Sequence, residues 1–173
     1  MMSRMVAMAV SAAIFGLVVG HHAVWAESEK AEQAELAKAL KDAKLTLENG
    51  LKASEREGKP ISAKFEVEHG KLQFSAYTLK GNDFMEVVAN PQSGAVEEAK
   101  KITDAEDLAA AKSQKDAMDK AKASLLAVTE KAVKANDGFR AASIFPSLKG
   151  GQPMAEVTLL KGDAFKTVSE KLD

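Results

Sequence analysis

The stretch Thr78-Leu79-Lys80-Gly81-Asn82-Asp83-Phe84 returns later in the chain as Leu159-Leu160-Lys161-Gly162-Asp163-Ala164-Phe165. The two copies begin 159 minus 78, or 81, positions apart. Each contains a two-residue loop with glycine first, Gly-Asn or Gly-Asp, which is typical of a β-hairpin closed by a II′ turn. Similarity at one fixed spacing indicates an internal duplication, so the whole chain can be compared with itself at that offset.

A second two-residue loop, His69-Gly70, precedes the first copy and predicts a three-stranded meander. The two loops independently place one set of apolar residues on the same face, which a one-residue slip in either hairpin would prevent. This set is Ile61, Ala63, Phe65, Val67, Leu72, Phe74, Ala76, Met85, Val87 and Ala89. In the second copy Gly150-Gly151 replaces His69-Gly70, and we expect Val157 opposite both Ile144 and Val168.

A long helix is predicted before each meander. From Ser28 to about Glu57, leucines and alanines at helical spacing form one apolar stripe. A second helix, opened by a capping box of Thr103 and Glu106, is expected to run to about Ala135. The charged segment from Glu97 to Lys101 favours a join between the units, although its composition also allows a helix.

The expected fold class is therefore α+β. We expect two tandem repeats, each a long helix packed on a three-stranded antiparallel meander. The first repeat covers residues 27–98 and the second, which is truncated, covers residues 99–173.

Residues 1–26 resemble a secretory signal peptide. Arg4 precedes an apolar run from Met5 to Val19, and Val24-Trp25-Ala26 resembles a cleavage site. A membrane anchor is the alternative, but the run is shorter than the roughly 20 apolar residues that a spanning helix needs. We therefore expect a periplasmic or secreted protein that leaves the membrane after cleavage.

The cysteine count and the net charge limit the kinds of covalent bond and the classes of partner that the chain can have. The chain has no cysteine, so it offers neither a disulfide nor a site for a lipid-bearing cysteine, and its formal charge is −1. That balance argues against nucleic acid and anionic membranes as partners, since both attract a basic surface.

No residue pattern predicts an enzyme, a metal site or a cofactor. His69 is the only histidine after the signal segment, and its position in a hairpin loop favours a turn residue over a ligand or a catalytic base. Three acidic clusters lack the alternating oxygen ligands of a calcium loop, which favours solvated helix faces and turns. These clusters are Asn82-Asp83, Asp104 with Glu106 and Asp107, and Asp116 with Asp119.

The end of the first meander resembles the PepSY domain family. There Glu86-Val87-Val88 runs into Ala89-Asn90-Pro91-Gln92-Ser93-Gly94-Ala95-Val96, which is similar to the valine-rich strand and tight turn of that family. Asn90 stands where the family more often has Asp, and the second copy ends before such a turn. The resemblance implies a non-catalytic exported protein, because PepSY domains occur in the pro-segments of secreted metalloproteases and as small envelope proteins.

The outward face of each sheet is expected to be polar, for example at Ser62, Lys64 and Glu66, except near the second hairpin of each copy. We therefore expect an apolar interaction surface there, and its candidate residues are Tyr77, Leu79, Phe84, Val88, Leu160 and Phe165. These residues could clamp their own hairpins, pack against each other across the repeats, or bind a protein partner.

Two functions follow from these observations. The first is a binding or regulatory protein that engages another envelope protein, such as a protease. The second is a small-ligand carrier with its cleft between the two repeats.

Overall fold

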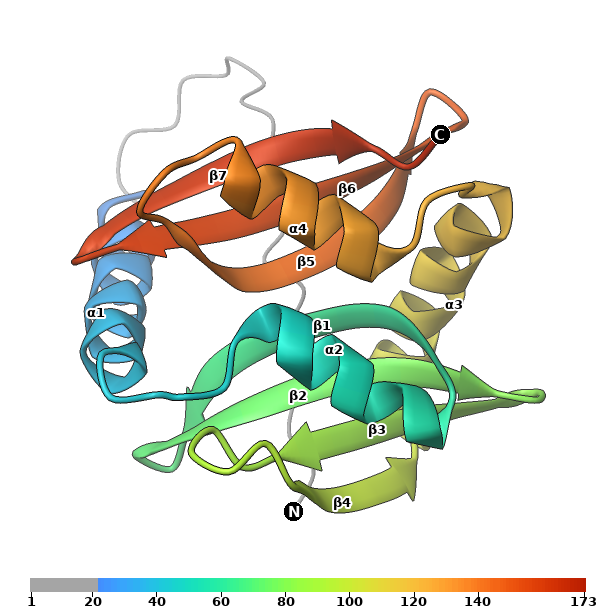
Figure 1. The fold of residues 1–173 in the computed structure, drawn as a ribbon, viewed down its shortest axis with the longest axis horizontal. Helices are drawn as coiled ribbons and strands as arrows, with labels where there is room; N and C mark the ends of the chain where they lie inside the picture. The colour runs from blue at the N-terminus through green and yellow to red at the C-terminus, as the bar shows by residue number, and fades with distance from the viewer. Residues whose placement is uncertain (1–21) are drawn as a thin grey trace.

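The structure, a computed structural model, describes residues 22–173. Within that range the chain forms four α-helices and seven strands (Figure 1). The helices are α1 (His22–Leu40), α2 (Leu47–Ser54), α3 (Ala105–Lys120) and α4 (Leu125–Lys134), and a short 3-10 helix covers Glu55–Glu57. The strands are β1 (Lys59–Glu68), β2 (Lys71–Lys80), β3 (Asp83–Ala89), β4 (Val96–Lys101), β5 (Arg140–Lys149), β6 (Gln152–Lys161) and β7 (Ala164–Lys171).

All seven strands belong to one antiparallel sheet with the order β4-β3-β2-β1-β5-β6-β7. The α+β class is thus confirmed, but the two predicted meanders are joined edge to edge. Their junction is the central pair β1 and β5, where Ala63 lies opposite Ile144 and Lys64 lies opposite Ser143.

The predicted registers are confirmed in both halves. Leu79 lies opposite Phe84, and Val157 lies opposite both Ile144 and Val168. The turn glycines Gly81 and Gly162 have φ of 62° and 61°, as the first position of a II′ turn requires. Strands β1 and β5 begin at 59 and 140, and β2 and β6 begin at 71 and 152, so both pairs keep the offset of 81.

The prediction of one long helix before each meander is wrong, because two shorter helices precede each meander. Thr46 caps α2 by accepting a hydrogen bond from the Asn49 backbone N–H (3.2 Å), and Ser124 caps α4 in the same way. Asp104, rather than Thr103, caps α3. A cap within an apolar stripe starts a new helix, because its side chain satisfies backbone N–H groups that would otherwise lack partners.

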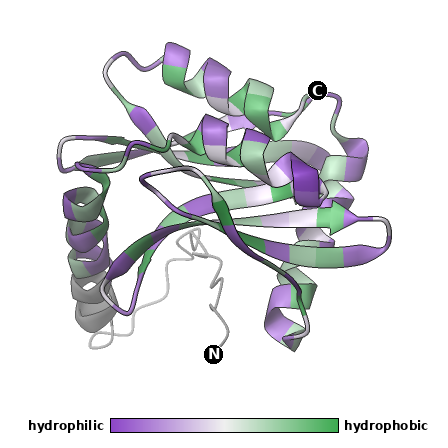
Figure 2. Ribbon diagram, turned by 60° about the horizontal axis from the view of Figure 1, so that its bottom comes forward, coloured by the Kyte–Doolittle hydropathy of each residue, from purple (hydrophilic) through white to green (hydrophobic). Residues whose placement is uncertain are grey.

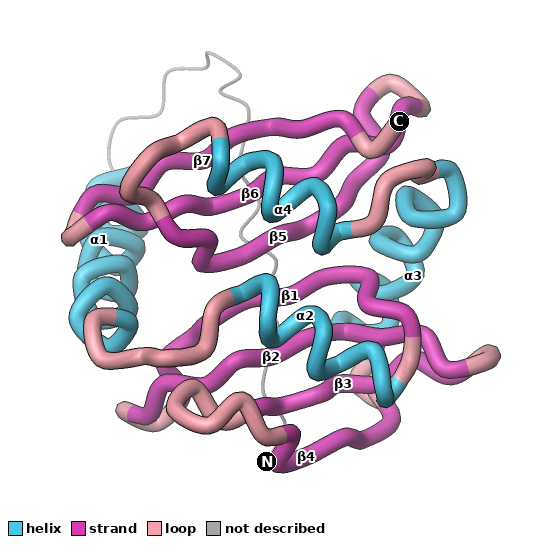
Figure 3. The backbone as a smooth tube through the Cα atoms, viewed as in Figure 1, coloured by secondary structure: helices cyan, strands magenta, loops and turns pink. Residues whose placement is uncertain are grey.

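The break allows the two helices of each half to use different faces of the sheet. Helices α2 and α4 lie side by side on one face, here named the α2/α4 face (Figures 1 and 3). Helices α1 and α3 lie at the two ends of the opposite face, named the α1/α3 face (Figure 2). The sheet is therefore the middle layer, with apolar residues of both surfaces contributing to the core.

The segment predicted as a join is strand β4, paired with β3. Asn90 starts the turn that precedes β4. Its side-chain oxygen accepts hydrogen bonds from the backbone N–H groups of Gln92 (2.8 Å) and Ser93 (3.1 Å). Gly94 completes the turn with φ of 73°. The repeat boundary predicted between residues 98 and 99 consequently falls inside a strand.

Close approach on the α2/α4 face requires a glycine in α2. A Cβ atom at Gly50 would lie 2.4 Å from the nearest atom of the Phe74 ring. Phe74 is fully buried and meets Phe65 edge to face, with 5.6 Å between ring centroids. The glycine thus allows α2 to pack closely against the sheet.

Arg140, the first residue of β5, ties the α1–α2 loop to the other half of the sheet. Its Nη1 donates to the carbonyl oxygens of Leu40 (2.8 Å) and Ala43 (3.3 Å), and its Nη2 donates to that of Leu45 (2.8 Å). The guanidinium also lies 5.8 Å from the centroid of the Phe65 ring. Burial lowers the pKa of Arg140 below its ordinary value, although the group remains charged at neutral pH.

We predict that Gly50→Ala destabilises the protein by about 1 to 3 kcal/mol, because the added methyl group overpacks the core against Phe74. In an unobstructed helix the same change would stabilise by about 0.5 to 1 kcal/mol. Urea denaturation measures the effect. In a Phe74→Leu background the cost of Gly50→Ala should shrink, and an equal cost in both backgrounds would contradict the clash.

We predict that Arg140→Met lowers the free energy of unfolding by about 2 to 4 kcal/mol, because it removes three hydrogen bonds from a charged donor. Arg56→Met, at an exposed position, is the matched control and should change stability by less than about 0.5 kcal/mol. Equal urea midpoints for the two variants would show that Arg140 does not hold the loop.

Candidate functional site

The predicted interaction residues do not form an exposed patch. Tyr77 and Leu160 are core residues, with 0% and 4% of their surfaces exposed. The other four are half-buried: Leu79, Phe84, Val88 and Phe165. The chain's own helices account for this cover, which sequence patterning within the strands could not indicate.

The two apolar pairs also cannot pack on each other across the halves. Because β1 and β5 are antiparallel, the β2–β3 and β6–β7 turns lie at opposite ends of the sheet (Figure 1). Near the first turn, the backbone N–H of Ile102 donates to the Phe84 carbonyl (2.9 Å), and the buried Ile102 leads directly into α3. Near the second, Lys41 forms an ion pair with Asp163 (3.0 Å).

Helix α3 covers a group of polar side chains on the α1/α3 face of the first half. Ser62 donates a buried hydrogen bond to Gln114 of this helix (2.8 Å). Tyr77 lies opposite both Ser62 and Glu86 in the sheet. We name Tyr77, Glu86, Lys100 and Asp107 the Glu86 cluster.

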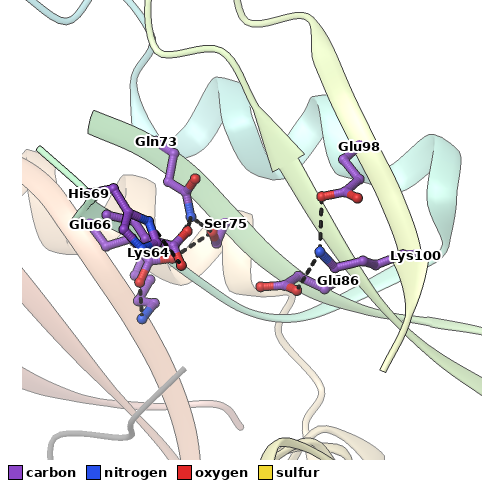
Figure 4. A network of polar contacts seen from close by, with 9 residues as sticks. Lys64, Glu66, His69, Gln73, Ser75, Glu86, Glu98 and Lys100 are labelled. Atoms are coloured by element: carbon purple, nitrogen blue, oxygen red, sulfur yellow. Dashed lines mark hydrogen bonds and ion pairs between the residues drawn. The ribbon is translucent and has the colours of Figure 1, made fainter. Parts of the chain in front are cut away.

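The carboxylate of Glu86 is the most perturbed group of this cluster. Only 4% of the residue is exposed, and its Oε1 atom has no hydrogen-bond partner within the described chain. Its Oε2 atom lies 3.9 Å from Lys100 Nζ, which is closer to Glu98 Oε2 at 3.0 Å (Figure 4). Lys100 is thus shared between a buried and an exposed carboxylate.

Burial raises the pKa of Glu86 to about 7, and the negative charges of Glu66 and Asp107 add to the shift against the opposing effect of Lys100. A buried carboxyl group without good partners costs less free energy when it carries a proton. Burial also raises the pKa of Tyr77, with a further contribution from Asp107. The cluster therefore contains a neutral phenol and a carboxyl group that holds its proton up to about neutral pH.

A second network lies beside the cluster on β1 and β2, and it behaves in the opposite way (Figure 4). Glu66 forms an ion pair with Lys64 and accepts hydrogen bonds from Ser75 (2.7 Å) and Gln73 (3.1 Å). Burial alone would raise the pKa of Glu66, but these partners together lower it below its ordinary value. The pKa values of Glu66 and Glu86 are therefore shifted in opposite directions.

The two halves differ at these positions. Adding 81 to each number places Phe145 at the position of Lys64 and Ser147 at that of Glu66, and threonine at both the Tyr77 and Glu86 positions. Sequence reasoning treated this polar face as solvated and missed the cluster. The available signal was Glu86 itself, a carboxylate inside the apolar strand Phe84-Met85-Glu86-Val87-Val88.

The side chains of the Glu86 cluster and of the network beside it can form ion pairs and bind protons. Among residues 22–173 there is no group of three or more His, Cys, Asp or Glu side chains placed to hold a metal ion. His69 occupies the predicted β1–β2 turn with φ of 50°, and its Nδ1 atom lies 4.0 Å from Glu68. Within the same range no helix is both long and apolar enough to cross a membrane.

Comparison with known proteins gives one structural likeness. No protein-family model matches the chain, and no curated protein matches it. The chain is similar to a crystal structure described as "a putative lipoprotein" from Clostridium difficile 630, with 15% identity and a TM-score of 0.35. The alignment covers 70% of this chain and 89% of that one. The PepSY resemblance therefore rests on the sequence motif.

We predict that the stability of the protein falls as pH rises from about 5 to 8, in part because Glu86 must lose its proton. Its folded-state pKa of about 7 is above the ordinary value of 4.5, so this contribution is complete below about pH 4.5 and is lost as pH rises through 7. Glu86→Gln should remove up to about 3 kcal/mol of this dependence, and it should raise the melting temperature at pH 8 relative to the wild type.

The control for this experiment is Glu55→Gln, at an exposed residue. Its melting temperature should follow that of the wild type at every pH. If Glu86→Gln and the wild type also lose stability in parallel between pH 5 and 8, Glu86 does not carry the proton.

Proposed function

We propose that this chain is an exported, non-catalytic binding or regulatory protein of the cell envelope, and that it engages a protein partner through the α1/α3 face of its first half. The supporting observation is the asymmetry between the halves. Lys64, Glu66 and Glu86 are buried or half-buried charges, whereas the residues 81 positions later are Phe145, Ser147 and Thr167. Burying charge is costly, and the second half forms without charges at these three positions, so the fold itself does not require them in the first.

The layout of the chain supports a duplicated unit of two helices and a meander. The strands of the two halves keep the offset of 81, and β1 and β5 both shift register at equivalent places, between 60 and 62 and between 141 and 143. The unit resembles PepSY domains at the turn from Ala89 to Val96. By that resemblance the partner is a protease or another envelope protein.

Export is supported by the composition of residues 1–26, whose first 21 residues lie outside the described range. The expected cleavage after Ala26 would fall within α1, which begins at His22. Without cysteine, an exported domain would depend on its hydrophobic core rather than on disulfides for stability.

The alternative function, a small-ligand carrier with a cleft between the repeats, has less support. Because β1 pairs directly with β5, the sheet is continuous at the boundary between the halves. A ligand site at that boundary would have to lie on a sheet face rather than between two bodies. The polar groups there, including Glu66, Gln73 and Ser75, already bond to one another.

We predict that the wild-type protein, immobilised and exposed to envelope extract of its source, retains a partner that the double variant Glu68→Lys with Gln73→Ala does not. Both residues lie in the polar network of the α1/α3 face, and Glu68 accepts a hydrogen bond from Gln73 (3.0 Å). A charge reversal there should oppose a complementary partner. Retention is measured by quantitative mass spectrometry at moderate salt.

The control is Glu130→Lys, an exposed change on α4 at the opposite face. It should retain the same partner as the wild type. Equal retention by all three proteins would contradict binding through the α1/α3 face. A small molecule found bound in the native mass spectrum, with no retained protein, would favour the carrier.

A further inference from the structure

Strand β4 forms one edge of the sheet in residues 22–173. Its acidic residues lie on one side of a central alanine and its basic residues on the other. Its sequence is Val96-Glu97-Glu98-Ala99-Lys100-Lys101, with two acidic residues before a central alanine and two basic residues after it. Five of the six residues are exposed, and Lys100 is half-buried. Read in the opposite direction the charge pattern is reversed, so the strand is complementary to an antiparallel copy of itself.

The hydrogen-bond pattern determines which residues of β4 point away from the sheet. Beyond its last residue, the Ile102 backbone N–H donates to Phe84 on β3, in step with the pairing of Lys100 with Glu86. In an antiparallel ladder successive residues bond alternately to one side and the other. Lys100 therefore bonds towards β3, and the backbone groups of Ala99 and Lys101 point to the free edge.

Only one register satisfies both the backbone and the charges. Two antiparallel copies must place outward-facing residues opposite each other, so the symmetry axis must pass through a residue pair such as Ala99 with Ala99 of the second copy. This register sets Glu97 opposite Lys101 and Glu98 opposite Lys100. Moving the axis by one residue instead sets Glu98 opposite Glu98 or Lys100 opposite Lys100, which places like charges together.

We propose that β4 is a self-association edge, at which two copies of this chain pair antiparallel about Ala99 and form one continuous sheet. Four glutamate–lysine pairs then cross the junction, two from each copy. Backbone groups of β4 that have no partner within residues 22–173 gain one, which is the usual source of affinity in strand addition.

Side-chain contacts within the chain already orient these charges along the edge. Lys101 forms an ion pair with Asp83 (2.6 Å), and Glu97 accepts a hydrogen bond from Asn90 (2.7 Å). Glu97 also lies at a register shift between β3 and β4, which shortens the regular ladder. The junction is consequently small, and the dimer should be weak and depend on concentration and salt.

The other edge, β7, could also set Lys166 opposite Glu170 of a second copy, but these charges are engaged within the chain. Its Lys166 bonds to Asn136 (2.6 Å) and its Glu170 forms an ion pair with Lys131 of α4 (2.7 Å), so both are held over the α2/α4 face. Glu170 retains only 19% of its side-chain exposure. The two charges of β7 therefore already have partners on the α2/α4 face, which favours β4 as the pairing edge.

Sedimentation equilibrium of the purified protein, at concentrations up to about 1 mM because the junction is small, tests the proposal with two charge variants. One is Glu97→Lys with Glu98→Lys, and the other is Lys100→Glu with Lys101→Glu. A homodimer of either variant would place like charges opposite each other across the junction. Each variant alone should therefore dimerise at least about tenfold more weakly than the wild type. An equimolar mixture of the two, with one variant labelled with ¹⁵N, should form a heterodimer, which native mass spectrometry identifies by its intermediate mass.

The variant with all four substitutions restores the complementary order and should dimerise as the wild type does, which also shows that the exchanged charges permit folding. Lys166→Glu on β7 is the matched control and should leave dimerisation unchanged. A wild type that remains monomeric throughout the range would overturn the proposal. Dimers of undiminished strength in either charge variant, or no heterodimer in the mixture, would overturn it as well.

Discussion

The antiparallel pairing of β1 with β5 is the constraint on which the rest of the structure depends. It joins two meanders into one sheet and makes their second hairpins point in opposite directions. Each half then has one face free for the paired helices α2 and α4, while α1 and α3 take the two ends of the other face. Arg140 reinforces the junction, since it begins β5 and bonds to carbonyl groups after α1.

The sheet could be predicted from sequence in detail, because period-two patterning and glycine turns act locally. Two hairpin loops were enough to set every pairing from Phe65 to Ala89. The helices were harder to place, because Thr46 and Ser124 interrupt stripes whose apolar spacing continues across the break. Strand β4 was missed because an exposed edge strand carries no apolar alternation and depends on its neighbour for structure.

The candidate site could not be predicted, for a reason of tertiary structure. The side chains of Lys64, Glu66 and Glu86 have the alternation of a solvated strand face, and only the folded structure reveals that they are largely removed from water. Once buried, Glu66 on β1 and Glu86 on β3 have pKa values shifted in opposite directions. Glu66 has a lysine and two hydrogen-bond donors, whereas Glu86 shares a more distant lysine with Glu98. Local partners, rather than residue type, decide the protonation state.

The contacts of Arg140 also bear on the order in which the chain can fold. Its bond to Leu40 joins residues 100 positions apart, so the loop after α1 acquires its partner only when most of the chain is available. A chain that emerges from its N-terminus first therefore cannot complete its first half independently. Such late closure would suit the proposed export, because the stable fold would form only after nearly the entire chain had passed through a translocation channel.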